Sequence, residues 1–360
     1  MTNQTTETDQ ATETGQATLS RPADTAQAAP ERQLVSLAAS LPRLLAPTAL
    51  LLIVLIFSVL SPKFLSLDNL VGVLGQNALL LLAATAMTVI VRAGGIDLSI
   101  GVAIDLAAFT AAFLLFQGYV AWYAIVFAIA TGAAVGVVNA FLIIVLNIRP
   151  FLATLSVWFI GAGLQLLLTG GGSPIYLPAS RVPEEFAALG KGAVLGVAVP
   201  SLIAVLVLLL VWVLLERSRW GRVLTAAGEQ PIATSIAGRL TRTSLAAAYV
   251  LAGGIAAIAG ILLASRSDGF VANSGQLYVL DAIGAVFIGA TLSRTGRPHL
   301  VGTLVGVLVF ALLSNGMNLI GLSFYWQGLA RGAVLLAILL LGVLLSAERF
   351  QRVGRARSAA

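Results

Sequence analysis

The sequence has 360 residues but no cysteine, a single histidine and little charge, since Asp, Glu, Lys and Arg make up only 10% of it. Without cysteine there is no disulfide framework and no cysteine metal site, and His299 alone does not build a typical zinc or haem site. We therefore expect no metal. Soluble domains usually carry about 25% charged residues, whereas 59% of this chain is hydrophobic and its mean hydropathy is +0.98. A soluble core could not bury so much apolar surface, so the chain is predicted to lie in a lipid bilayer.

The sequence motifs of ATP binding and of hydrolysis are also missing. The one Gly-Lys pair, Gly190-Lys191, has Glu185 where a phosphate-binding loop needs its first glycine, and no Ser or Thr follows it. Neither H-E-x-x-H nor G-x-S-x-G occurs, and no two carboxylates stand at a useful spacing. We therefore predict that the chain is not an enzyme and has no catalytic residue. The function of an intramembrane enzyme is also disfavoured, because the sequence offers no paired catalytic groups for it.

Ten apolar runs fill most of the chain, and each is near the roughly 20 residues that cross the hydrocarbon core of a membrane. The run at 279–293 is short, and the run at 98–116 begins inside a polar motif. Small residues at helical spacing, as in "LAGGIAAIAGILLAS", predict close packing between helices. The fold is predicted to be an all-α polytopic membrane protein with about ten transmembrane helices. The ten runs are 44–60, 70–91, 98–116, 121–146, 151–169, 196–215, 244–264, 279–293, 300–320 and 326–346.

The distribution of Lys and Arg predicts the orientation, because these residues accumulate in cytoplasmic loops. If the N-terminus lies inside and the spans alternate, 16 of the 21 basic residues fall on the inner side. Basic cytoplasmic loops then account for the net charge of +6, and no nucleic-acid partner is expected. An even number of spans places both termini in the cytoplasm. The remaining five basic residues are Lys63, Arg181, Lys191, Arg266 and Arg331.

The two ends of the chain differ from the apolar middle. The first 30 residues are rich in Thr, Gln and Ala, so residues 1–40 are predicted to form a disordered cytoplasmic tail. It is not a signal peptide, because no basic region directly precedes a short apolar run. Residues 41–347 are expected to form the transmembrane domain, and residues 348–360 a basic cytoplasmic tail.

The longest inner loop, 216–243, carries five arginines. Within it Pro231 suits the first position of a helix, Ile232 and Ile236 fall on one face, and Gly238 suits the position just past the end. This pattern predicts a short cytoplasmic helix with a small apolar face, and a plain basic loop is the alternative. In the outer loop, Pro183 followed by two acids predicts a short surface helix.

Polar side chains inside the predicted spans are candidates for function, because a charge at mid-bilayer costs about 2.5–3.5 kcal/mol or more. Asp105 is the one convincing deep acid, whereas an ion-coupled transporter usually shows acids in several spans. The alternative for each residue is a hydrogen bond between helices or a side chain that reaches the membrane surface. The polar set comprises Gln76, Asn77, Asp105, Asn139, Gln165, Asp281, Ser314, Asn315, Asn318 and Arg331.

Five motifs, in order, carry a resemblance to a known family. They are "GGIDLSIG" (94–101), "IRPFLATLSVWFIGAGLQLLLTGGGSPI" (148–175), "WGRVLTAAGEQPIATSIAG" (220–238), "YVLDAIGAVFIGATL" (278–292) and "GTLVGVLVFALLSNGMNLIGLSFYWQ" (302–327). Together they resemble the signatures of monosaccharide-type ABC importer permeases, the ribose, xylose, arabinose and galactoside branch. The residues of the first motif that match are Gly94, Gly95, Asp97, Ser99 and Gly101.

The resemblance covers roughly residues 45–346, with a few departures. Asp105 stands where the family usually has a small or apolar residue, and Arg92 where a small or hydroxyl residue is commoner. Gln230 replaces an Asn and Ala237 a Ser. The stretch "GATLSRTGRPH" replaces a glycine-rich one. The last change puts the identity of the sugar in doubt more than transport itself.

The resemblance implies the permease subunit of an ATP-binding cassette importer, which moves a pentose or hexose across the bacterial inner membrane by alternating access. ATPase subunits would bind ATP and Mg, so this chain would hold no cofactor. A periplasmic or lipid-anchored sugar-binding protein would deliver the sugar, and a second permease copy or a paralogue would complete the pathway within the membrane lipid. The segment that couples to the ATPase would contain Gly228, Glu229, Gln230, Pro231, Ile232, Ile236 and Gly238, and the translocation pathway would be lined by Asp105, Asp281, Asn315 and Asn318.

An ion-coupled secondary transporter of a small neutral solute is the alternative function. It would act without an ATPase, and it would be expected to show repeated halves with broken helices, of which the sequence gives no convincing sign.

The stretch "RAGGIDLSIG" (92–101) is predicted to be a turn at the cytoplasmic membrane edge. Arg92 would anchor the second span, and Asp97 and Ser99 would meet the unpaired amides at the start of the third helix. The glycines would allow a tight turn. Direct contact with the sugar is the alternative role for this stretch.

Overall fold

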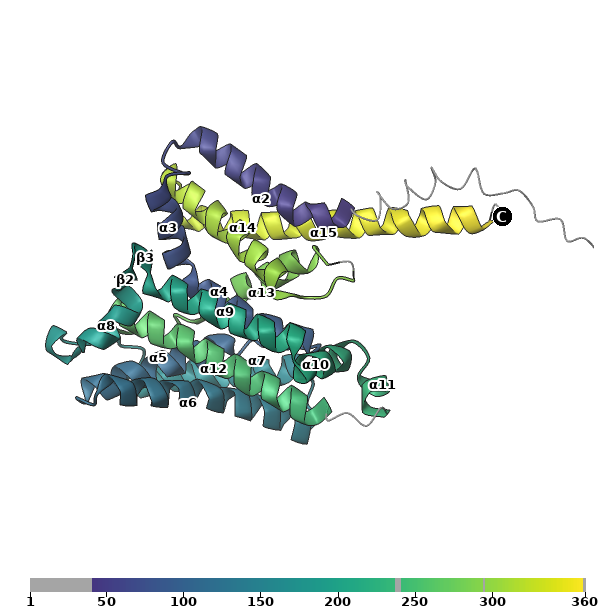
Figure 1. Cartoon of the computed structure of the whole chain (residues 1–360). Coiled ribbons are helices and arrows are strands. Elements are labelled where there is room, and N and C mark those ends of the chain that lie inside the picture. Colours follow the sequence, from purple (N-terminus) through teal and green to yellow (C-terminus); the bar gives the residue numbers. More distant parts are fainter. Residues whose placement is uncertain (1–40, 237–240, 294, 359–360) are drawn as a thin grey trace, which may run out of the picture. The chain divides into compact units, whose positions relative to one another are not determined.

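The computed structural model describes residues 41–236, 241–293 and 295–358 (Figure 1). The predicted tail 1–40 lies outside these ranges, as does Gly238. The helices of eight or more residues are α2 (Leu41–Leu60), α3 (Leu67–Gln76), α4 (Ala78–Arg92), α5 (Ile100–Phe116), α6 (Ala121–Ala140), α7 (Pro150–Leu168), α8 (Glu184–Lys191), α9 (Val199–Arg217), α10 (Arg219–Glu229), α12 (Thr241–Ser267), α13 (Gln276–Ala290), α14 (Leu300–Leu319) and α15 (Phe324–Ser358).

The shorter elements extend or connect these helices. The π-helix η1 continues α6, and the 3₁₀ turn η2 precedes α8. Two pairs of very short antiparallel strands, β1 with β4 and β2 with β3, tie loops together. These elements are η1 (Phe141–Val145), η2 (Ala179–Arg181), α11 (Pro231–Ile236), β1 (Ile175–Tyr176), β2 (Ala193–Val194), β3 (Val197–Ala198) and β4 (Gly269–Phe270).

Each predicted span corresponds to one helix or to two consecutive helices. Seven helices in the described part of the chain are long and apolar enough to cross a membrane, and the pair α3 and α4 makes an eighth. The two weakest predicted spans are the shorter apolar helices α5 and α13, with 17 and 15 residues. The prediction of an all-α fold with about ten spans is therefore confirmed. Helix α15 runs on to Ser358, past the predicted end of its span at residue 346.

The second predicted span is broken. Helices α3 and α4 are bent by 49° around Asn77, where the sequence suggests one continuous run. The side chain and the backbone amide of Asn77 both donate to the carbonyl oxygen of Val73, at 2.9 and 3.1 Å, so Asn77 closes the end of α3. Its own carbonyl accepts from the amide of Leu81 in α4, so Asn77 joins the two helices at a bend that hydropathy does not reveal.

The centre of the bundle is packed through small residues. Helix α12 lies against α4, α5 and α6. Gly253 on α12 approaches Gly132 on α6 so closely that a Cβ added to Gly253 would collide with the carbonyl of Gly132. Gly260 meets the backbone of α5 at Ile104 in the same way. The predicted close packing of the small-residue stripe is confirmed, because only glycine permits these contacts.

The loops gather at two opposite ends of the spans. Figure 1 shows α10 and α11 at one end and α8, β2 and β3 at the other. Each end carries an ion pair. Arg92 binds Glu216 at the first end, and Lys191 binds Asp268 at the second. The predicted surface helix after Pro183 is present as α8.

Helices α5 and α13 meet near their N-termini. The backbone amide of Gly275, which immediately precedes α13, donates to the Asp105 carboxylate of α5 at 2.6 Å. Gly101, in the first turn of α5, lies against Gln276 and Val279 of α13, and any larger residue there would displace them. Two short helices from distant parts of the sequence thus support each other inside the bundle.

Candidate functional site

The first candidate region is α10, which follows α9 after a single residue, Ser218. The Ser218 hydroxyl accepts a hydrogen bond from the amide of Gly221 at 3.0 Å and donates to the carbonyl of Leu214 at 2.5 Å. It therefore caps the start of α10 while it closes the last turn of α9. Ser218 is extended, so the chain turns there and lays α10 across the end of the spans.

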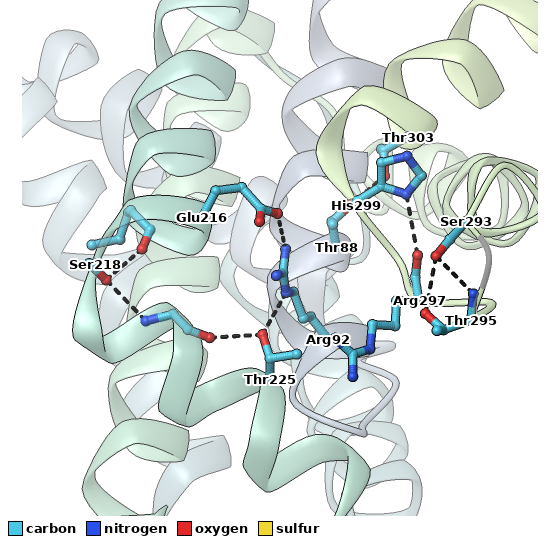
Figure 2. A network of polar contacts seen from close by, with 12 residues as sticks. Thr88, Arg92, Glu216, Ser218, Thr225, Ser293, Thr295, Arg297, His299 and Thr303 are labelled. Carbon is cyan, nitrogen blue, oxygen red and sulfur yellow. Dashed lines mark hydrogen bonds and ion pairs between the residues drawn. The ribbon is translucent and has the colours of Figure 1, made fainter.

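Arg92, the last residue of α4, binds both Thr225 of α10 and Glu216 of α9 (Figure 2). Its Nε donates to Thr225 Oγ1 at 2.7 Å, and its Nη1 forms an ion pair with Glu216 of α9. The Thr225 hydroxyl donates in turn to the carbonyl of Gly221 at 2.8 Å. The side chain of Arg92 is largely buried, so it joins α4, α9 and α10 in one polar network.

A second ion pair holds the other side of α10. Glu229, its last residue, binds Arg297 in the loop between α13 and α14. The backbone of that loop is ordered by Ser293, whose hydroxyl accepts from the amide of Thr295, and by His299, whose ring nitrogen contacts the carbonyl of Arg297 (Figure 2). Arg92 and Arg297 thus contact α10 from two different parts of the sequence.

The turn between α4 and α5 is built around Asp97. The Asp97 carboxylate accepts from the amide and the hydroxyl of Ser99, at 2.8 and 2.6 Å. Asn139 of α6 donates to the Ser99 hydroxyl at 2.6 Å, and Thr154 of α7 bridges the backbones of Ile96 and Leu98. Asp97 and Ser99 are buried, an arrangement that favours the architectural role over sugar contact.

Ser99 differs in detail from the predicted cap. It occupies the N-cap position of α5, but its side chain makes no capping hydrogen bond to the helix. The hydroxyl donates to Asp97 instead, because that carboxylate lies two residues back and is buried with it. Asp97 therefore meets the amide of Ser99 as expected, whereas Ser99 acts as a link to Asn139.

The two matched glycines at the start of this turn are in close contact with other elements. Gly94 has a φ of +85°, and a Cβ added to it would lie 3.0 Å from the carbonyl oxygen of Gly228 on α10. A Cβ added to Gly95 would lie 2.8 Å from the Tyr249 hydroxyl of α12. The turn therefore contacts α10 and α12 directly through its backbone.

The short helix predicted to begin at Pro231 is present as α11. It begins at Pro231, directly after Gln230, the C-cap residue of α10. Ile232 and Ile236 are 75% and 80% exposed, so the helix carries an accessible apolar surface beside the arginines of α10. Of the seven residues expected to couple to an ATPase, Gly228 and Glu229 end α10, and Gly238 lies outside the described residues.

The second candidate region lies at the opposite end, between α13, α14 and α15. Asp281 forms an ion pair with Arg331, whose Nε donates to the hydroxyl of Ser314 at 3.0 Å. Gln327 is in contact with Arg331 and donates to Asn318 Oδ1 at 2.7 Å. We call Asp281, Ser314, Asn318, Gln327 and Arg331 the polar cluster. It unites two of the four predicted pathway residues.

The other two predicted pathway residues lie apart from the polar cluster. Asn315 exchanges two hydrogen bonds of 2.9 Å with Asn69 of α3. Asp105 is fully buried on α5 and contacts the start of α13 through Gly275.

Sequence reasoning missed Gln327 as a member of the polar cluster. Its spacing of four residues from Arg331 on one helix was the available signal.

Comparisons with known proteins place these features in context. Residues 69–339 match the family described as "Branched-chain amino acid transport system / permease component". The chain is 34% identical to the ribose import permease protein RbsC of Escherichia coli (strain K12) over 292 residues, which is 81% of this chain and 91% of that protein. It is 36% identical to the RbsC protein of Bacillus subtilis (strain 168) over 81% of this chain and 90% of that protein. It is 32% identical to the galactose/methyl galactoside import permease protein MglC of E. coli (strain K12), over 79% of this chain and 89% of that protein. No solved structure matches the chain.

Proposed function

The chain belongs to the family of branched-chain amino acid transport system permease components, and from this membership we propose that it is the membrane permease of a bacterial importer for a monosaccharide. The family description names amino acids, but the relatives with the highest identity reported above are import permeases for ribose and for galactose and methyl galactosides. The observation that carries the proposal is their 32–36% identity over about four fifths of the chain.

Membership of this family implies ATPase and binding-protein partners. A permease component is not itself catalytic, so the energy comes from ATP bound elsewhere. The chain is a multi-pass protein of the inner membrane, as its spans and its relatives indicate. We propose further that the binding protein is periplasmic or lipid-anchored, and that a second copy of this chain or a paralogue completes the pathway.

We propose that α10 and α11 form the segment that couples to the ATPase. Ile232 and Ile236 of α11 are accessible at the end of the spans where the basic loops gather, and a small apolar helix of this kind suits a groove on a soluble partner. Arg219 and Arg222 of α10 line a hollow together with Thr234 of α11, so an acidic group of the partner beside α11 would be complementary.

The polar cluster supports a pathway between α13, α14 and α15. The side chains of Asp281 and Arg331 are 19% and 24% exposed within a membrane span. Exposure of such a pair to lipid is costly, so this face is expected to border water, sugar or another subunit. Asn318 and Asp281 therefore stay as proposed pathway residues. Asn315 directly follows Ser314 on α14 but pairs with Asn69 of α3, and we keep it as a separate proposed pathway residue.

Asp105 is a weaker candidate for the pathway. Its side chain has no exposed surface, and one of its oxygens is bonded to the amide before α13. These contacts support a role in holding α13 in place. We propose sugar contact for Asp105 only if its carboxylate becomes accessible in another state of the transport cycle.

The decisive experiment is purification of the tagged chain from its native membranes. We expect an ATPase and a sugar-binding protein to co-purify, and the complex in liposomes to take up radiolabelled D-ribose or D-galactose only when ATP is present on the ATPase side. Uptake by the chain alone, driven by a proton or sodium gradient, would instead establish the secondary transporter. Absence of any ATPase from the purified complex would overturn the proposal.

A further inference from the structure

Helix α10 joins the rest of the protein through a small apolar contact, made by Leu224 and Trp220, and through polar contacts on both of its sides. Of its eleven residues, only Gly221, Leu224 and Thr225 are buried. A cavity of about 330 Å³ lies beside it, lined in part by Arg92, Glu216, Glu229 and Arg297. A helix with so small a buried face has room to shift, and its position depends on the groups that bind it from either side.

Two arginines described above bind α10 from its two sides. Arg92 donates to Thr225 of α10 and pairs with Glu216 of the neighbouring α9, and Arg297 forms an ion pair with Glu229 at the C-terminal end of α10. Figure 2 shows the Arg92 contacts together with the loop that carries Arg297. These contacts connect α10 to α4 and to the loop before α14, two parts of the membrane domain that are far apart in sequence.

The end of α10 also touches the turn after α4 through backbone alone. A Cβ added to Gly228 would collide with the carbonyl oxygen of Arg92, and a Cβ on Gly94 would lie 3.0 Å from the carbonyl oxygen of Gly228. No flexible side chain lies between these two segments. A displacement of α10 would therefore reach the turn without being absorbed by rotamer changes.

The turn is joined to three further spans. Asn139 of α6 binds Ser99, Thr154 of α7 binds the backbones of Ile96 and Leu98, and Tyr249 of α12 lies against Gly95. The turn therefore connects α10 with the central helices of the bundle.

We propose that two arginines form a clamp that seats α10 on the turn 92–99, so that movement imposed on α10 is passed to the transmembrane helices. Arg92 binds Thr225 of α10 while its ion pair with Glu216 of α9 holds it in place, and Arg297 forms an ion pair with Glu229 of α10. The inference rests on the proposed function, because it assigns α10 to the coupling segment. Arg92 and Arg297 are positioning residues here. They act by holding α10, and the Gly94–Gly228 contact carries the movement.

The test measures how strongly the binding protein stimulates ATP hydrolysis by the purified complex in lipid nanodiscs. We expect Arg92→Met and Arg297→Met each to lower the ratio of stimulated to unstimulated rate about two- to fivefold, the range of a partly exposed ion pair and of weak coupling between sites. The unstimulated rate should persist, because the ATPase still docks on α11. Gly228→Ala should lower the ratio as well, since it separates α10 from the turn.

A charge exchange and a matched control complete the design. The double variant Arg297→Glu with Glu229→Arg should recover the ratio lost in Arg297→Met, because it restores an ion pair of reversed polarity. Lys191→Met breaks an ion pair of similar exposure at the opposite end, with side chains 45% and 39% exposed against 49% and 38% for Arg297 and Glu229, and should leave the ratio unchanged.

The outcomes separate the clamp from the proposed function. A wild-type complex that contains no ATPase refutes the proposed function itself. A stimulated wild-type complex whose clamp variants keep the wild-type ratio refutes the clamp alone. The clamp is also refuted if Lys191→Met lowers the ratio as much as the clamp variants do. It is refuted as well if a clamp variant loses all activity and the charge exchange restores no activity. Recovery in the charge exchange, with an unaffected control, supports the clamp.

Discussion

Asp105 places a carboxylate at the start of a helix that belongs to another part of the chain. It is completely buried on α5, and its oxygen accepts from the amide of Gly275 just before α13. A carboxylate at this position satisfies an amide that the helix itself leaves unpaired and meets the positive end of the helix dipole. Asp105 thus makes a direct contact between α5 and the start of α13, apolar helices of 17 and 15 residues.

Substitution of Asp105 distinguishes capping from a role in transport. Asp105→Asn keeps an oxygen acceptor, so we expect little change in thermal stability and near-normal transport. Asp105→Val leaves the Gly275 amide unpaired and should destabilise the protein by about 1–3 kcal/mol, the cost of a buried unsatisfied donor. Thermal unfolding of the detergent-purified protein measures the stability of both variants, and sugar uptake measures their transport. A stable Asp105→Asn variant without transport would show instead that the charge itself is needed.

In the polar cluster, Asn318 is an exposed member and accepts from Gln327, which is buried. We expect Asn318→Ala to reduce the initial rate of sugar uptake about five- to tenfold at normal expression, because one hydrogen bond of about 1 kcal/mol is lost to the sugar or to the cluster. Thr110→Val is the control, since Thr110 pairs with Thr131 on α5 and α6, away from the cluster. Unchanged uptake by Asn318→Ala at normal expression would remove Asn318 from the pathway.

At the scale of elements, the sequence predicted which helices exist better than how they end. The spans 98–116 and 279–293 were the weakest by length and hydropathy, and both are present as short helices whose N-terminal turns meet. The bend at Asn77 was not predicted, because hydropathy does not register a side-chain hydrogen bond to the end of the preceding helix. Pro231 at a first helical position, together with the spacing of Ile232 and Ile236, predicted α11, because these are local signals.

Helix α11 offers a test of the coupling segment that spares the fold. Because Ile232 and Ile236 are mostly exposed, we expect the double change Ile232→Ser with Ile236→Ser to leave the melting temperature of the permease within a few degrees. The yield of co-purified ATPase should fall severalfold, since exposed apolar anchors contribute most to such contacts. As a comparison, Leu202→Ser with Val205→Ser alters two exposed apolar residues of α9 within the membrane span. Equal ATPase yield from the α11 variant and the wild type would contradict the assignment.

At the scale of the whole molecule, local sequence patterns predicted the number of spans, and motif order predicted the family. The contacts between distant segments were beyond reach. Nothing in the spacing of Arg92, Glu216, Glu229 and Arg297 indicates which arginine meets which acid, because that pairing depends on how α4, α9 and α10 are packed. The same holds for Asn69 and Asn315, which lie on helices 246 residues apart.

The absence of cysteine allows a direct test of the orientation. Single cysteines at Thr295, in the loop before α14, and at Ser323, before α15, would be the only thiols in the chain. Both residues are exposed, and they lie at opposite ends of α14. The excess of basic residues at the end that holds Arg92 and Arg297 predicts that Thr295 lies in the cytoplasm. A membrane-impermeant maleimide should therefore label Ser323→Cys in intact spheroplasts and Thr295→Cys only in inverted vesicles. The reverse pattern would place α10 and α11 outside the cell, where no ATPase could reach them, so the same two cysteines also test the basis of the coupling proposal.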